Sequence, residues 1–146
     1  MPDVRRITAE HIAQVAKIEA ETFSEPWSES ALSILCTEAY PSFALCEGEA
    51  VVGYVSCIRA LDEIQIINVA VRSDRKRRGY GKMLLDALVS YCEGNEISQI
   101  SLEVRQSNSA AISLYEKCGY EKVGLRKNFY RLPTESAIVM IKNLKF

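Results

Sequence analysis

The most informative segment of the sequence is Val69-Ala70-Val71-Arg72-Ser73-Asp74-Arg75-Lys76-Arg77-Arg78-Gly79-Tyr80-Gly81-Lys82-Met83-Leu84-Leu85. It predicts a buried strand, then a basic loop with two glycines, and then an amphipathic helix. Behind the loop, the residues that recur at the spacing of one helix face are Gly81, Leu84, Leu85, Leu88, Val89 and Cys92. The chain therefore passes from a strand into a helix through a turn rich in positive charge.

The turn into this helix has the features of a phosphate site. The first amides of a helix have no partner inside it, and the helix dipole adds partial positive charge at the same end. Gly79 and Gly81 lack the Cβ that would keep a bulky anion from the backbone. The loop also carries five basic side chains: Arg72, Arg75, Lys76, Arg77 and Arg78. We therefore expect an anion to bind at this turn.

The loop matches neither common nucleotide fingerprint, because Lys82-Met83 follows Gly81 where a Walker loop needs Lys-Ser/Thr, and the third glycine of a dinucleotide loop is absent. Residues 76–81 instead resemble the acyl-CoA signature of the GNAT superfamily of N-acetyltransferases, Gln/Arg-x-x-Gly-x-Gly/Ala. That signature binds the pyrophosphate of coenzyme A mainly through backbone N–H groups. Lys76 departs from its first position. By itself, the six-residue pattern also fits a solvated basic loop or a nucleic-acid patch.

Length and charge set the broad class. The 146 residues predict a single domain, 1–146, and 48% hydrophobic with 25% charged residues is ordinary for a globular protein. Residues 72–82 carry a net charge of +5 in a chain of −1, so the remainder sums to −6. This asymmetry favours one local anion site and argues against direct nucleic-acid binding. With no apolar run near ~20 residues and no signal-peptide pattern, we expect a cytoplasmic protein without a membrane partner.

The five cysteines are odd in number, widely spaced and set in apolar segments: Cys36, Cys46, Cys57, Cys92 and Cys118. The chain has no Cys-x-x-Cys pair, and His11 is its only histidine. We therefore expect reduced, buried thiols, with neither a metal site nor a Cys–His nucleophile.

The predicted elements alternate along the chain in the order β-α-α-β-β-β-α-β-α-β-β, an α/β (α+β) mixed sheet with helices on both faces. The expected strands are 4–7, 42–46, 51–58, 64–71, 97–104, 120–125 and 137–144, with a connection at 126–133. Helices are expected from Ala9, after Ser28, at 81–92 and after Ser107 or Asn108.

The strand 64–71 changes its apolar parity partway. Ile64 and Ile66 share one face, whereas Ile67, Val69 and Val71 share the other. Either a β-bulge or a strand buried on both faces explains this pattern.

A second part of the chain strengthens the family resemblance. The run Leu102-Glu103-Val104-Arg105, followed by Asn108, Ala111, Leu114-Tyr115-Glu116 and Gly119-Tyr120, resembles the GNAT segment LEVR…N…A…LYE…GF. With residues 26–28, 68–71 and 126–130, the likeness covers most of the chain. It is greatest to the bacterial branch that acetylates the N-terminal alanine of a small-subunit ribosomal protein. The resemblance implies the GNAT fold (a mixed, mostly antiparallel sheet), acetyl-CoA as co-substrate and that ribosomal N-terminus as acceptor.

The resemblance also implies roles for particular residues. Glu103 would be the general base, through water, and Tyr115 the general acid. Backbone groups of Val69, Ala70 and Val71 would hold the acetyl and pantetheine arm, and Asn108 would contact acetyl-CoA. The pyrophosphate would lie on the backbone of Arg77, Arg78, Gly79, Tyr80, Gly81 and Lys82. From the residues alone, Glu103 also fits a solvated strand carboxylate, Tyr115 a core position and Asn108 a helix cap.

For the acceptor groove, Trp27 and Tyr130 are candidate walls, with Glu25 and Asp62 or Glu63 nearby. Trp27 also fits a simple packing role on Leu32, beside a helix capped by Ser28. At neutral pH a lysine amine is roughly 3 kcal/mol harder to deprotonate than an α-amine, which favours an N-terminal acceptor for a lone carboxylate base. The alternatives are a GNAT enzyme for a lysine side chain, polyamine or small molecule, and a non-catalytic acyl-CoA sensor or RNA binder.

Overall fold

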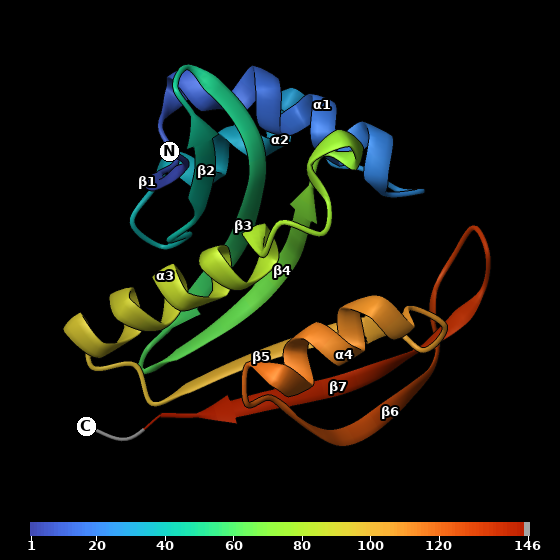
Figure 1. The fold of residues 1–146 in the computed structure, drawn as a ribbon. Coiled ribbons are helices and arrows are strands. Elements are labelled where there is room, and N and C mark those ends of the chain that lie inside the picture. The colour runs from blue at the N-terminus through green and yellow to red at the C-terminus, as the bar shows by residue number, and fades with distance from the viewer. Residues whose placement is uncertain (145–146) are drawn as a thin grey trace.

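The computed structural model describes residues 1–144, and a seven-stranded sheet runs through its centre (Figure 1). The strands are β1 (Asp3–Arg6), β2 (Phe43–Glu47), β3 (Ala50–Ala60), β4 (Glu63–Val71), β5 (Gln99–Arg105), β6 (Glu121–Tyr130) and β7 (Glu135–Asn143). Their spatial order is β1-β2-β3-β4-β5-β7-β6, and only the β4–β5 pair is parallel. The predicted order of elements and the mixed, mostly antiparallel sheet are confirmed.

Helices cover both faces of the sheet. On one face lie α1 (Ile12–Thr22), which follows a 3₁₀ turn at Ala9–His11, and the short α2 (Glu29–Leu32). On the other face lie α3 (Tyr80–Gly94) and α4 (Ser109–Lys117). None of the helices within residues 1–144 combines the length and apolar character needed to cross a bilayer.

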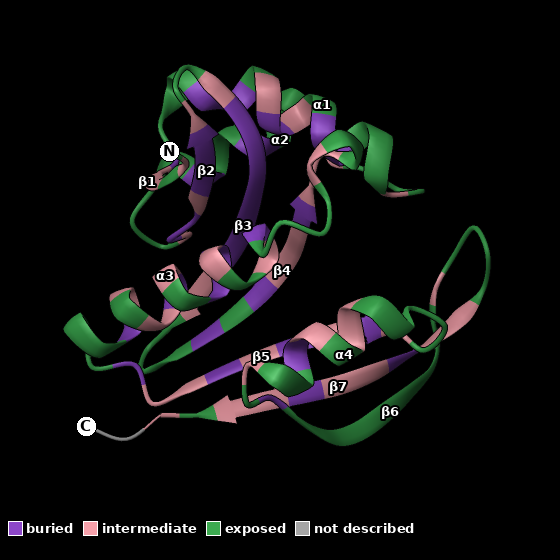
Figure 2. Ribbon diagram, viewed as in Figure 1, coloured by how far each residue is buried: buried purple, intermediate pink, exposed green. Residues whose placement is uncertain are grey.

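Each face of the sheet has its own hydrophobic cluster, and β3 is buried on both sides. Its Val55 packs with Leu84 and Leu88 of α3, whereas the neighbouring Tyr54 packs with Val15 of α1. Side chains of a strand alternate between its faces, so successive residues of β3 join different clusters. Figure 2 shows β3 buried along most of its length and the edge strand β6 exposed.

Of the two explanations for the change of parity in β4, the structure has the β-bulge. Ser56 of β3 pairs with Asn68, and the next residue, Cys57, pairs with Ile66, which leaves Ile67 without a partner on β3. The extra residue shifts the parity of β4, so the prediction that apolar residues before and after it face opposite ways is wrong. The residues that pack on the same α3-side cluster are Ile64, Ile66, Val69 and Val71.

The strands β4 and β5 separate in the middle of the sheet. They pair only from Glu63 opposite Gln99 to Gln65 opposite Ser101, although both strands continue beyond that point. In Figure 1 the two strands diverge from their paired end toward the carboxyl end of each. The divergence exposes one backbone edge of β4 and one of β5.

Two sequence predictions need correction here. The segment expected to be a connection from Arg126 belongs to β6, which continues to Tyr130 with irregular register against β7. This strand is exposed and basic, so its sequence lacks the apolar alternation that marks a half-buried strand. Cys36 is exposed and Cys118 is only partly buried, whereas Cys46, Cys57 and Cys92 are buried as expected.

Candidate active site

The basic loop between β4 and α3 reverses direction through two left-handed residues. Arg77 has a φ of 65° and Gly79, the residue before the first turn of α3, has a φ of 77°. A left-handed backbone strains residues with a Cβ, so glycine is favoured at the second position. A Cβ placed on Gly79 would meet no atom within 4 Å, so the space beside this residue is open.

The start of α3 offers free amide groups, as predicted. The first helical hydrogen bond runs from the Met83 N–H to the Gly79 carbonyl at 3.1 Å. The amides of Tyr80, Gly81 and Lys82 have no acceptor within residues 1–144. Three donors therefore point out of the amino end of a 15-residue helix.

The second glycine has a different role from the predicted one. A Cβ on Gly81 would lie 2.8 Å from Cδ2 of Leu114, a residue of α4. The absence of a Cβ at Gly81 therefore lets the Leu114 side chain of α4 pack close to α3, and the open space beside Gly79 has no counterpart on this side of Gly81.

The loop carries less free positive charge than its sequence indicates. Carboxylates within 3 Å pair with three of the six basic side chains of residues 72–82, in the ion pairs Arg72–Asp74, Arg75–Glu47 and Lys82–Asp86. Lys76, Arg77 and Arg78 have no ion pair among the described residues. The cationic part of the loop is therefore residues 76–78, next to the free amides.

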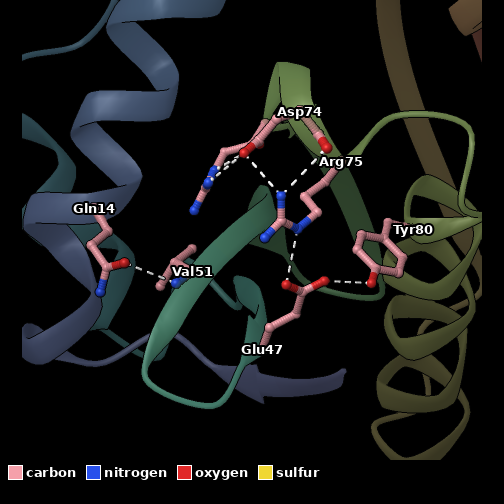
Figure 3. Close-up of polar contacts among 7 residues, drawn as sticks. Gln14, Glu47, Val51, Asp74, Arg75 and Tyr80 are labelled. Carbon is pink, nitrogen blue, oxygen red and sulfur yellow. Dashed lines mark hydrogen bonds and ion pairs between the residues drawn. The ribbon is translucent and has the colours of Figure 1, made fainter. Parts of the chain in front are cut away.

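One carboxylate at the end of β2 holds the loop from below (Figure 3). Glu47 Oε2 accepts a hydrogen bond from the Tyr80 hydroxyl at 2.5 Å, and Oε1 accepts one from Arg75 Nε at 2.9 Å. The Tyr80 hydroxyl and then Arg75 hold the pKa of Glu47 below its usual value. Since the Tyr80 side chain is engaged in this way, only its backbone remains available to a ligand.

The hairpin that carries Glu47 is itself tied to α1. Gln14 of α1 accepts a hydrogen bond from the Val51 amide at 2.8 Å, and its own amide donates to the Glu49 carbonyl at 3.2 Å. Figure 3 shows the Gln14–Val51 contact beside the Glu47 cluster. The loop and the first helix are therefore joined through one turn.

The predicted acyl-binding part of β4 lies on the diverging edge. The Arg72 amide bonds to the Val52 carbonyl of β3 at 2.8 Å. Since antiparallel pairs alternate, the backbone groups of Val69 and Val71 point away from β3, toward the side where β5 no longer pairs. Ala70, opposite Tyr54, uses its own N–H in the ladder, so Val69 and Val71 are the open positions.

Glu103 stands on the polar face of β5, two residues beyond the last pair with β4. Its Oε1 accepts a hydrogen bond from Gln65 Nε2 at 2.8 Å, and its Oε2 lies 3.4 Å from Nε of Arg126. The side chain is 12% exposed, and Oε2 is buried without a hydrogen-bond partner among the described residues. Glu103 thus has one oxygen oriented by Gln65 and one that makes no hydrogen bond but has Arg126 at ion-pair distance.

Tyr115 belongs to the opposite face. It is a buried residue of α4 in the α3-side cluster, and its ring lies edge-on to Tyr120 at 5.7 Å. Burial raises the pKa of the Tyr115 hydroxyl, and a charge on Tyr130 would raise it further. The hydroxyl makes no hydrogen bond within residues 1–144.

Asn108 caps the same helix, since its Oδ1 accepts a hydrogen bond from the Ala111 amide at 3.1 Å.

Tyr130 is the electrostatic neighbour of both predicted catalytic groups. Burial first, and then the charge of Glu103, raise its pKa to about 12. Its hydroxyl also contributes to the raised pKa of Tyr115. Tyr130 is therefore electrostatically close both to Glu103 and to Tyr115, which stand on opposite faces of the sheet.

Arg105 contacts one candidate groove wall, Tyr130, and the segment that precedes the other, Trp27. Its guanidinium stacks 4.5 Å from the centre of the Tyr130 ring and donates to Ser24 Oγ at 3.3 Å, in the segment that leads to Trp27. The same guanidinium donates to the carbonyls of Arg131 and Pro133 at 2.7 and 2.9 Å. One cation therefore links Tyr130 to the segment that leads to Trp27.

The acidic residues predicted beside those walls are partly misplaced. Asp62 and Glu63 lie at the β3–β4 turn, where the Asp62 carboxylate accepts a hydrogen bond from Ser98 Oγ at 2.9 Å. From Glu63 to Asn68 the strand rises about 16 Å, so this turn is at the far end of β4 from Trp27. Glu25 is exposed in the segment after α1 and stays a candidate.

Sequence reasoning missed Glu19. Glu19 is only 1% exposed and lies on the buried face of α1, one turn after Val15. Helical spacing gave a signal, because positions i and i+4 share a face. A carboxylate at a core position of a helix calls for partners, and the structure supplies them.

The family follows from comparison with known proteins. A family model described as Acetyltransferase (GNAT) family matches residues 12–120. The chain therefore belongs to the GNAT family and is an N-acetyltransferase.

The chain is also similar to individual members of this family. Over 143 residues the chain is 34% identical to the ribosomal protein bS18-alanine N-acetyltransferase of Haemophilus influenzae, covering 96% of this chain and 97% of that protein. The crystal structure of the ribosomal-protein-S18-alanine N-acetyltransferase from Escherichia coli superposes with a TM-score of 0.93 at 30% identity, covering 100% and 96% of the chains. A PaiA N-acetyltransferase from Thermoplasma acidophilum in complex with coenzyme A shares the fold, with a TM-score of 0.79 at 15% identity and 99% coverage of each chain.

Proposed function

We propose that this enzyme transfers the acetyl group of acetyl-CoA to the α-amine of an N-terminal alanine, on the small-subunit ribosomal protein that its relatives are named for. The observation that carries the chemistry is the buried Oε2 of Glu103, which makes no hydrogen bond and has Arg126 at ion-pair distance, beside the divergence of β4 and β5. The relatives in Haemophilus influenzae and Escherichia coli, aligned over nearly the whole chain, support the acceptor. A ribosomal acceptor implies a cytoplasmic enzyme.

The loop fits the pyrophosphate of acetyl-CoA. The open space beside Gly79 admits a bulky group, and the amides of Tyr80, Gly81 and Lys82 supply donors. The free charges of residues 76–78 add attraction for an anion, which the helix dipole reinforces. We assign the pyrophosphate to this turn, and the thioester arm to the open edge of Val69 and Val71.

Glu103 acts as the general base and Tyr115 as the general acid. Glu103 takes a proton from the attacking amine, through water, while Gln65 fixes the orientation of its carboxylate. The amine nitrogen then bonds to the thioester carbon, and the carbon–sulfur bond breaks. Tyr115 gives its proton to the leaving thiolate, and its raised pKa keeps that proton in place at neutral pH. Asn108 contacts the bound thioester in addition to capping α4.

The acceptor assignment is tested with peptides that differ only in their first residue. We expect alanine-initiated peptides with basic residues following to be acetylated, and bulky first residues to be poor acceptors. Mass spectrometry of the products, with a Glu103→Gln variant as the inactive control, measures this directly. Equal acetylation of every first residue would contradict the alanine preference, and acetylation of a polyamine instead would favour a small-molecule acceptor.

A further inference from the structure

Glu19 accepts hydrogen bonds from three separate parts of the chain. The Tyr54 hydroxyl of β3 donates to its Oε1, and Asn68 Nδ2 of β4 lies 3.3 and 3.4 Å from its two oxygens. The Trp27 backbone amide donates to its Oε2 at 2.9 Å. All of these contacts form around a side chain that is 1% exposed.

A carboxylate at such a position is costly unless every oxygen is satisfied. Burial of a charge is unfavourable by several kcal/mol in proteins, and hydrogen bonds have to compensate for it. An apolar residue would fill the same face of α1 without that requirement, as Val15 and Ile18 do beside it. Packing alone therefore does not account for a glutamate here, whereas the need to hold particular donors does.

The donors belong to the two sides of the proposed reaction. Asn68 directly follows the bulged Ile67 and precedes the edge assigned to the thioester. Trp27 lies in the segment 23–28 between α1 and α2, which has no helix or strand of its own and carries one candidate wall of the acceptor groove. The Glu19 carboxylate is thus the direct polar link between that segment and β4.

We propose that Glu19 is a positioning residue that fixes the Trp27 segment against the bulge of β4, so that acceptor and thioester meet in one geometry. The proposal rests on the proposed function for its catalytic consequence. Arg105 provides a second tie, from β5 to Ser24, so the segment is held at both ends. Misplacement of a reacting group by about 1 Å can cost a hundredfold in rate, which is why such a tie matters.

Three substitutions separate positioning from packing. Glu19→Met keeps the length of the side chain but removes every acceptor, whereas Glu19→Gln keeps one oxygen that the Trp27 amide can use. Tyr54→Phe removes a different donor of the same carboxylate and leaves the Trp27 contact in place. Glu19→Met and Tyr54→Phe disturb the buried cluster, but only Glu19→Met releases the segment.

Trp27 is the only tryptophan of the chain, so its fluorescence reports on the segment without any acceptor. We expect acrylamide to quench Trp27 more strongly in folded Glu19→Met than in the parent, with Glu19→Gln and Tyr54→Phe close to the parent. The KM for an alanine-initiated peptide should rise about tenfold or more in Glu19→Met only, while acetyl-CoA affinity stays unchanged. Parent-like quenching and KM in folded Glu19→Met would overturn the proposal.

Hydrogen exchange on the unaltered chain decides the question if Glu19→Met does not fold. The Trp27 amide should be protected like an amide of the sheet, because Glu19 holds it. Exchange as fast as at the exposed Glu25 would overturn the proposal. Fluorescence quenching and hydrogen exchange need no acceptor peptide, so they test the positioning role of Glu19 independently of acetylation. If the parent failed to acetylate the alanine peptide, that result would count against the proposed function alone.

Discussion

The Tyr80 hydroxyl donates a hydrogen bond to Glu47 Oε2 at 2.5 Å, so the residue between the two loop glycines is anchored to the end of β2 (Figure 3). Arg75, on the other side of the loop, donates to the second oxygen of the same carboxylate. A single side chain therefore fixes both ends of the turn before any ligand binds. Preorganisation of this kind improves affinity because less ordering is left for the binding step.

Glu47→Ala should therefore weaken acetyl-CoA binding. We expect a rise in Kd of about tenfold, equivalent to roughly 1.4 kcal/mol, since two donors lose their acceptor and the loop gains freedom. Calorimetric titration of acetyl-CoA measures the change. Glu49→Ala, an exposed carboxylate of the same hairpin, is the control and should bind as the parent does. Equal affinity in the two variants would contradict a role for Glu47 in shaping the loop.

The same contact predicts a pH dependence of stability. Since its hydrogen bonds lower the pKa of Glu47 in the folded state, the unfolded chain binds protons at this site more readily than the folded one. The stabilisation is therefore present above the unfolded pKa of about 4.3 and is lost as the pH falls through the lower folded value. Urea unfolding of parent and Glu47→Ala should differ most near neutral pH and converge in acid. A difference independent of pH would argue against this ion pair.

Gly79 offers a direct test of the pyrophosphate site. Gly79→Asp places a Cβ and a negative charge in the open space beside the free amides, so we expect no measurable binding of acetyl-CoA. Gly79→Ala is the matched variant, since it brings the left-handed strain of about 1–2 kcal/mol without the charge. It should fold and bind more weakly than the parent. Unchanged affinity in folded Gly79→Asp would place the pyrophosphate elsewhere.

Tyr115→Phe removes the proposed proton donor and nothing else. Turnover should fall by about 10²–10⁴-fold, the usual contribution of a general acid, with little change in acetyl-CoA affinity. Rapid-mixing kinetics under chemistry-limited conditions, together with calorimetry, separate the two effects. If turnover stayed within about threefold of the parent, Tyr115 would be a packing residue of α4.

Much of this architecture could be predicted because local patterns agree with the fold. The apolar face behind Gly81 specified α3, and alternation placed Glu103 on the polar side of its strand. The change of parity near Ile67 marked the bulge, since one extra residue reverses every later side chain. Residues whose local pattern and tertiary role coincide are the ones a sequence can place.

The rest depended on contacts between distant parts of the chain. The partners of Glu19 come from as far away as Asn68, and the pairing of Arg75 with Glu47 crosses from the loop to β2. The sequence around Gly81 is that of an anion site, but the place where its Cβ would stand lies against Leu114 of α4. Whether Asp62 lies near the acceptor groove depends on which end of β4 faces that groove, and the sequence does not give this. All of these contacts join residues that are far apart in the sequence, so no helix or strand periodicity could reveal them.

We propose that the acceptor is an α-amine, and acetylation of two differently blocked forms of one peptide tests this. Two peptides share a single alanine-initiated sequence with basic residues. One has its α-amine blocked and its lysines free, and the other has a free α-amine and blocked lysines. With acetyl-CoA, we predict that mass spectrometry finds a single acetyl group on the peptide whose α-amine is free, and none on its counterpart. Acetylation confined to the peptide with free lysines would contradict the N-terminal assignment.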